Sequence, residues 1–126
     1  MKVENIKFKA KRLDSGEWIE GDLVHSTNYI GIGQISGIFP DARVVHRVDP
    51  NTVCQFTGRY DYYGKELWEN DIVTHECKFY EGTIVWSDIE NSFKLIDSNG
   101  RKICELWKAP NIFRKCSALD KEDNHE

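Results

Sequence analysis

The sequence has few of the features that mark specialised chemistry or a special location. Among its 126 residues are 4 cysteines, and their spacing gives no CxxC pair that would bring two thiolates onto one zinc ion. No stretch reaches the length of about eighteen apolar residues that a membrane span needs, and no apolar segment follows the charged start. We therefore expect free thiols at Cys54, Cys77, Cys104 and Cys116, no cofactor and a reducing, cytoplasmic location.

Outside the last seven residues, the positive and negative charges of the chain nearly balance. The net charge is -4, and the last seven residues, 120–126, hold four acids and one lysine, which leaves residues 1–119 close to neutral. A near-neutral body lacks the positive field that draws proteins to a phosphate backbone, so nucleic-acid binding is not implied. We expect one domain over 1–119 and an acidic disordered tail over 120–126.

Alternating apolar residues and frequent turn residues predict strands along most of the chain. The fold class is all-β and mainly antiparallel, with little helix and two small β-barrel-like or SH3-like lobes, 1–52 and 53–119, packed as one domain. Asn99-Gly100 predicts a type I′ hairpin turn, and one short helix is expected after Pro110, through Leu119. The expected strands are 6–11, 17–25, 29–38, 44–48, 53–57, 71–75, 82–87, 92–97 and 101–107.

The most distinctive segment is Gln55-Phe56-Thr57-Gly58, then Asp61, Gly64-Lys65-Glu66-Leu67-Trp68 and Glu69-Asn70-Asp71-Ile72-Val73. It resembles the signature of the YopX family, and Trp18 to Leu23 matches that family as well. Asn70 stands where the family usually has glycine, and asparagine is the next most tolerant residue at positive φ. The resemblance implies the family's fold and a phage or prophage origin, and it brings no characterised activity.

A five-residue pattern occurs twice, at Glu20–Val24 and at Glu69–Val73. Two interpretations are open: an internal duplication, or a chance similarity among turn residues and aliphatic residues. In either case we expect Gly21, Asp22, Asn70 and Asp71 to form structural turns, with the aspartates accepting hydrogen bonds from nearby amides.

Aromatic residues between Arg59 and Trp68 are the leading candidates for binding a partner. Tyr60, Tyr62, Tyr63 and Trp68 fall within ten residues, and aromatic residues of this kind are enriched at interfaces. We expect them to mediate self-association into a homo-oligomer or binding to a host or phage protein. The function that follows is that of a noncatalytic phage or prophage accessory protein.

A basic strand gives the alternative function, single-stranded nucleic-acid binding. Lys7, Lys9, Lys11 and Arg12 share one strand, and a basic strand beside tyrosines is what small β-barrels use to bind single strands. The competing interpretation is a solvated edge strand that its lysines protect against edge pairing.

Catalytic and metal sites are the least supported candidates. Asp41, Glu76 and Lys78 imitate the acid, acid and lysine pattern of a metal-dependent nuclease, but the flanking helices of such enzymes are not expected. His75 and Cys77, with His25 or His46, could face a metal ion only if several strands converged. We expect neither an enzyme nor a metal centre.

Overall fold

The protein is described by a computed structural model that covers residues 2–35, 43–75, 81–109 and 111–123. The described chain is mostly antiparallel strand with one short α-helix, so the predicted all-β class is confirmed. It divides into two compact units, Met1–Phe56 (unit 1) and Thr57–Glu126 (unit 2).

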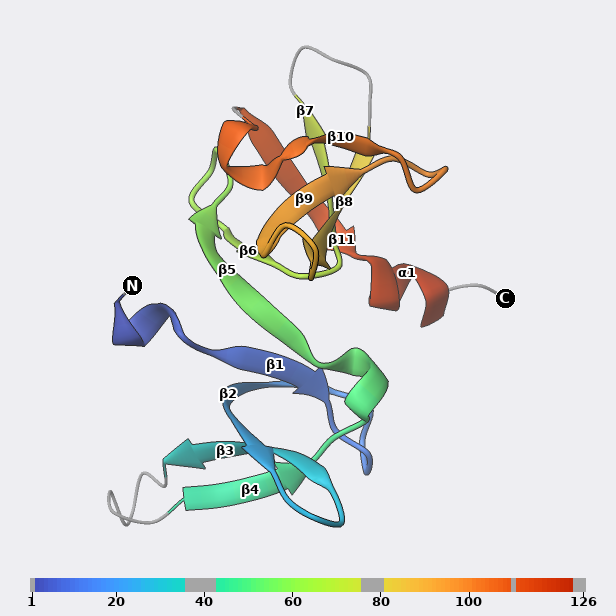
Figure 1. Cartoon of the computed structure of the whole chain (residues 1–126). Coiled ribbons are helices and arrows are strands. Elements are labelled where there is room, and N and C mark those ends of the chain that lie inside the picture. The colour runs from blue at the N-terminus through green and yellow to red at the C-terminus, as the bar shows by residue number, and fades with distance from the viewer. Residues whose placement is uncertain (1, 36–42, 76–80, 110, 124–126) are drawn as a thin grey trace. The chain divides into compact units, whose positions relative to one another are not determined.

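Unit 1 is an antiparallel meander in which each strand pairs with the next (Figure 1). Its strands are β1 (Phe8–Lys11), β2 (Trp18–His25), β3 (Ile30–Ile35) and β4 (Arg43–Arg47). The predicted hairpin between the first two strands is confirmed, with Gly16 at φ 74° in its turn. Ala10, Ile19, Ile32 and Val48 form the core, and the first residues of β5 (Cys54–Tyr60) pair with β1.

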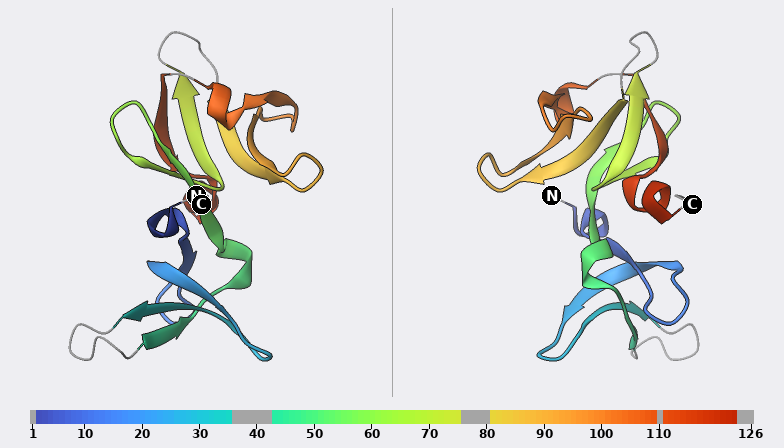
Figure 2. Two further views of the ribbon diagram at one scale, coloured as in Figure 1. Left: turned by 60° about the vertical axis from the view of Figure 1, so that its left-hand side comes forward. Right: turned by 90° about the vertical axis from the view of Figure 1, so that its right-hand side faces the viewer.

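Unit 2 contains the end of β5, which pairs with β6 (Glu66–Trp68), and a five-stranded antiparallel sheet in the order β10-β9-β8-β7-β11. These five strands are β7 (Asp71–His75), β8 (Glu81–Ser87), β9 (Ser92–Ile96), β10 (Lys102–Glu105) and β11 (Ile112–Ser117). The turn between β8 and β9 extends away from its sheet in both views of Figure 2. The core is aliphatic and consists of Leu67, Val73, Ile84, Leu95, Leu106 and Ile112.

The described residues also form four short helical segments, of which two lie between strands, one precedes the first strand and one follows the last. Three are 3-10 turns, η1 (Val3–Asn5), η2 (Pro50–Thr52) and η3 (Leu106–Lys108), and the fourth is α1 (Ala118–Asp123). In η2 the Asp49 carboxylate accepts a hydrogen bond from the Asn51 amide at 3.0 Å and Pro50 stands at the first helical position, which explains why strand pairing stops there.

The helix expected between Pro110 and Leu119 is wrong over most of that range, because β11 occupies Ile112–Ser117. This strand pairs with β7, and a bulge between Arg114 and Cys116 shifts the register. A bulge breaks the two-residue alternation by which a strand is recognised in a sequence. The α-helix begins only at Ala118 and covers the first four residues of the expected tail.

The turn at Asn99-Gly100 exists, but its predicted type is wrong. Among the described residues from Asp97 to Arg101 only Gly100 has a positive φ, at 79°, whereas a type I′ turn needs two such residues. The Asp97 carboxylate instead accepts hydrogen bonds from the amides of Asn99 and Arg101, both at 2.9 Å. The hydrogen bonds to the Asp97 side chain therefore stabilise a different turn type in the same hairpin.

Candidate functional site

Three of the four predicted binding aromatics are on the surface of unit 2. Tyr60, Tyr62 and Tyr63 are 54%, 61% and 74% exposed, and we call these three side chains the tyrosine surface. Trp68 is only 4% exposed, so its predicted role in binding is wrong: it lies in β6, where its side chain is buried. The aromatic content of this segment is therefore divided between the interior and the surface.

A buried carboxylate fixes the loop that carries Tyr62 and Tyr63. Asp61 is 7% exposed, and its carboxylate accepts hydrogen bonds from the amides of Tyr63 and Lys65 at 2.9 Å and from that of Arg114 at 3.0 Å. Burial by itself would raise the pKa of Asp61, but these three amides and the charge of Lys65 outweigh it and hold the pKa below its usual value. The loop conformation is thus determined by contacts within unit 2.

The loop is also attached to β11. The Tyr62 amide donates to the Ile112 carbonyl at 2.9 Å, and the rings of Tyr62 and Tyr63 pack against Phe113 with centroids 5.5 and 4.9 Å apart. Phe113 belongs to this site although its sequence context does not mark it. No local signal reveals it, because it lies fifty residues further along the chain.

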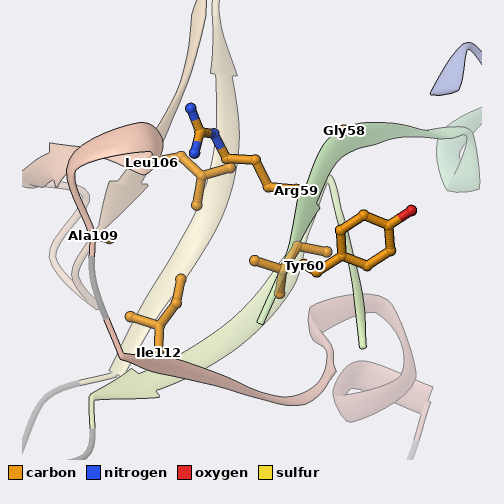
Figure 3. Close-up of a pocket in the computed structure, with 7 residues that line it drawn as sticks. Gly58, Arg59, Tyr60, Leu106, Ala109 and Ile112 are labelled. Atoms are coloured by element: carbon orange, nitrogen blue, oxygen red, sulfur yellow. The ribbon is translucent and has the colours of Figure 1, made fainter. Parts of the chain in front are cut away.

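A pocket of about 350 Å³ adjoins Tyr60. Its walls come from β5, β6, η3 and β11, and Figure 3 shows the Arg59 side chain extending from β5 toward Leu106 while the Tyr60 ring points away from it. The floor is aliphatic, since Leu67, Leu106 and Ile112 are core residues. The lining consists of Gly58, Arg59, Tyr60, Leu67, Leu106, Ala109 and Ile112.

The predicted basic strip, which spans β1 and the residue on either side of it, is largely covered by aromatic rings. Lys9 is 7% exposed, which contradicts the expectation of a solvated lysine face. The ammonium groups of Lys9 and Lys11 lie 4.6 and 5.4 Å from the centroid of the Trp18 ring. These are cation–π distances, and they hold the two charges against their own sheet.

The other two basic residues also have local contacts. The Lys7 ammonium lies 4.7 Å from the centroid of the Phe56 ring, and Arg12 donates to the Asp14 carboxylate at 2.7 and 3.0 Å. All four residues of the strip are therefore engaged within unit 1.

The first copy of the repeated pattern is not a turn, contrary to the prediction for Gly21 and Asp22. Both residues lie inside β2, where Asp22 is opposite Gly33 of β3. A Cβ atom on residue 21 would lie 2.3 Å from the carbonyl oxygen of Gly33. Glycine is required at this position because two strands approach closely and not because of an unusual φ.

The second copy forms the predicted turn. Asn70 has φ 70°, and the buried Asp71 carboxylate accepts hydrogen bonds from the Trp68 amide at 2.8 Å and from Arg114 Nε at 3.0 Å. The structural role assigned to both residues has a direct physical basis here. The two copies nevertheless have different backbone conformations, so the pattern does not mark a repeated structural unit.

A family model described as YopX protein matches residues 7–114. The chain belongs to the YopX family. No curated protein matches it. The matched range contains the tyrosine surface, Asp61, the pocket and the β1 basic residues, so the YopX model covers every candidate residue discussed above.

Within the described ranges, no three His, Cys, Asp or Glu side chains lie close enough to hold a metal ion. Asp41, Glu76, Cys77 and Lys78, on which the nuclease and metal-site hypotheses depended, are outside those ranges. The described helices include none that is long and apolar enough to cross a membrane.

Proposed function

We propose that this YopX-family protein is a noncatalytic protein-interaction module of a phage or prophage, that it acts in the host cytoplasm, and that it binds its partner through the tyrosine surface. The observation that supports this most directly is that the tyrosine rings are exposed while the loop that carries them is held in place. Tyr62 and Tyr63 are mostly exposed, yet the buried Asp61 carboxylate binds three backbone amides around them. Water-exposed rings on a fixed loop are suited to recognition.

The physical advantage is entropic. A binding loop that is ordered only on association loses conformational freedom at that moment, and this loss weakens the complex. In unit 2 that freedom is already lost on folding, because Asp61 and Phe113 restrain the loop and its rings. Tyrosine adds a large apolar area with a hydroxyl at its end, which suits a surface that is wet when free and buried when bound.

Partner capture tests the proposal. The immobilised full chain is exposed to extract from infected or lysogenic cells, beside a Tyr62→Ser/Tyr63→Ser variant and a Val3→Ser control, whose residue is an exposed apolar side chain of unit 1. We expect the parent and the control to retain the same protein and the double variant to lose it. Hydrogen exchange at β11 checks that the double variant keeps its sheet. Equal retention by the double variant would contradict the proposal.

Self-association is part of the same proposal, since a second copy of the chain is a partner of the required kind. Unit 2 also has exposed apolar side chains outside the tyrosine surface, among them Ile89 and Trp107. Homo-oligomers are the common outcome where such surfaces meet. We expect the mass in solution to increase with protein concentration.

Single-stranded nucleic-acid binding is the competing function, and the contacts of β1 weigh against it. Lys9 and Lys11 are held over Trp18, and Arg12 is paired with Asp14. Fluorescence anisotropy with a labelled single strand should show weak or no binding at physiological salt. Tight binding that weakens with salt and disappears when Lys7, Lys9 and Lys11 are replaced would favour the alternative.

A further inference from the structure

The turn between β8 and β9 presents an unusual side chain to solvent. Ile89 is 94% exposed, the highest value among the large apolar side chains of the described residues. It stands between two acids, Asp88 and Glu90. An aliphatic group at the end of a projecting turn has no role in the core of its own unit. The Glu90 carboxylate is paired with Lys94 and Lys102, so the acidic side of the tip is the Asp88 carboxylate, which accepts a hydrogen bond from Trp86.

This turn is held in one conformation. Trp86 Nε1 donates to the Asp88 carboxylate at 2.8 Å, and the Glu90 amide donates to the Ser87 hydroxyl at 3.2 Å. Asn91 follows at φ 51°, and behind the turn the ring of Trp86 packs edge-on against Phe93 with centroids 5.0 Å apart. Ile89 is therefore presented by a fixed scaffold, which lowers the entropy lost on binding.

The pocket beside β5 has the complementary chemistry. Its volume of about 350 Å³ is at the small end of the range for binding pockets, and its floor consists of buried aliphatic side chains, Leu67, Leu106 and Ile112. The single charged residue of its lining is Arg59. Within the described residues the Arg59 guanidinium takes part in no ion pair, so a carboxylate placed beside it would meet an available charge.

We propose that the protein self-associates head to tail, with Ile89 of one copy inserted into the pocket of a second copy. The Asp88 carboxylate then lies beside Arg59 at the rim, while Glu90 keeps its lysine partners within its own copy. Ile89 does not occupy the pocket of its own chain, because no residue of the tip is among those that line it. This inference rests on the self-association put forward above and names its contact.

Charge favours this occupant over a polyanion. Residues 57–126 hold ten basic and fourteen acidic residues, so unit 2 as a whole repels a nucleic-acid backbone. The tip of a second copy brings one carboxylate without a cationic partner among the described residues, that of Asp88, to the single arginine of the pocket, whereas a nucleic acid brings a row of phosphates. The chain itself supplies an exposed aliphatic residue with acids on both sides.

The symmetry of the proposed contact follows from the two surfaces that form it, the Ile89 tip and the pocket. Tip and pocket are different surfaces, so each copy offers one of each and the interface is heterologous. Such contacts produce rings where the rotation closes and open chains where it does not. A variant that lacks the tip can therefore still accept a tip, and a variant that lacks the pocket can still supply one.

Sedimentation equilibrium of the full chain tests the proposal. The parent should exceed the monomer mass of 14.7 kDa as its concentration rises. Ile89→Ser and Arg59→Glu should each raise the concentration needed for association by about tenfold or more, since they remove a buried aliphatic group or reverse the matching charge. Leu13→Ser is the matched control, because Leu13 is an apolar side chain of unit 1 that is 62% exposed. It should associate like the parent.

Mixing the two variants gives the sharper test. Ile89→Ser keeps an intact pocket and Arg59→Glu keeps an intact tip, so the mixture should form a complex of two chains that grows no further. A parent that stays at 14.7 kDa, an Ile89→Ser variant that associates like the parent, or a mixture that stays monomeric would each overturn the proposal. A monomeric parent would also overturn the self-association expected under the proposed function, but it would leave untouched a captured partner that depends on Tyr62 and Tyr63. Failure of the tip contact and failure of the tyrosine surface are therefore distinguishable.

Discussion

The same short pattern has opposite structural roles in the two units. In unit 1, Glu20–Val24 is the interior of β2, and Gly21 is there because the Gly33 carbonyl would overlap any Cβ. In unit 2, Asn70 is a turn residue at positive φ and Asp71 begins β7. Similar residues in a similar order therefore meet different steric demands. Such a pattern predicts which residues are structurally constrained. It does not predict whether the constraint is a close contact between strands or a positive φ.

The two units also differ in how they accommodate charge. In unit 1, basic side chains lie on aromatic rings: Lys9 and Lys11 on Trp18, and Arg47 on Tyr29. In unit 2, carboxylates are buried and accept hydrogen bonds, as Asp61 and Asp71 do. Cation–π contacts tolerate the loss of one partner, whereas a buried carboxylate leaves unsatisfied donors when it is removed. We therefore expect unit 2 to be the more sensitive to substitution of acids and to acidic pH.

The largest expected difference in unfolding free energy is between substitutions of Asp71 and of Asp22, the aspartates of the two copies of the pattern. Asp71→Ala removes a fully buried carboxylate and leaves the Trp68 amide and the Arg114 guanidinium without that acceptor. Removing one partner of a buried pair costs several kcal/mol, and because Arg114 remains partly exposed we expect a loss of about 3 kcal/mol of unfolding free energy. Urea unfolding followed by tryptophan fluorescence measures it.

Asp22→Ala is the matched control. Asp22 is exposed in the interior of β2, so its replacement should change the unfolding free energy by no more than about 0.5 kcal/mol. Equal losses for the two aspartates would show that the pattern has one role in both units, and the contrast drawn here would be wrong.

A smaller difference in stability is expected between substitutions at the second residue of each copy, which is Gly21 in unit 1 and Asn70 in unit 2. Gly21→Ala places a methyl group against the backbone of β3, with 2.3 Å between its Cβ and the Gly33 carbonyl oxygen, and we expect a loss of about 2 kcal/mol through forced separation of the strands. Hydrogen exchange should show weaker protection in β2 and β3 than in β7 and β11. Asn70→Gly, which keeps access to positive φ, should leave both regions protected. A Gly21→Ala variant with unchanged exchange would argue against the close strand contact.

The smallest effect is on pH dependence and concerns Glu105. Hydrogen bonds from Lys102 and Lys94 lower the pKa of Glu105 from 4.5 to about 2. The folded state then binds fewer protons than the unfolded state between these values, so the contribution of Glu105 is complete above about pH 4.5 and is lost as the pH falls toward 2. Asp61, whose pKa is also lowered, acts in the same direction.

Hydrogen exchange as a function of pH measures this dependence unit by unit. Acidification should weaken protection in β9 and β10 more than in β2 and β3, and Glu105→Gln should flatten the decline in unit 2. A Glu105→Gln variant with the pH dependence of the parent would contradict the role of the Lys102 and Lys94 hydrogen bonds.

Sequence reasoning succeeded where one residue type has one dominant local effect. The alternation around Phe8 and Ala10, the glycine-containing turn before Trp18 and the asparagine at position 70 each pointed to the observed strand, hairpin or turn. It failed where a distant partner decides the outcome. The bulge in β11 depends on pairing with β7, and the burial of Lys9 depends on the ring of Trp18 across the hairpin.

The candidate site shows the same division. Tyr60, Tyr62 and Tyr63 could be selected from composition alone, but Trp68 could not be separated from them, because the sequence does not show which rings face the core. Phe113 and Ile112 reach the site only through the hydrogen bonds that attach the loop to β11. Arg59 and Ile89 gave no sequence signal, since their roles depend on a pocket and on an exposed turn.

The sequence by itself determined the all-β class, the family and most strand positions, because the alternation of apolar residues and the steric needs of glycine and asparagine act over a few neighbouring residues. Only the tertiary structure decided which aromatics are exposed, which acids are buried and which glycine is needed for contact between strands. Those properties depend on strand register and on atoms far away in the chain, such as the Gly33 carbonyl opposite Gly21 and the Arg114 amide that binds Asp61.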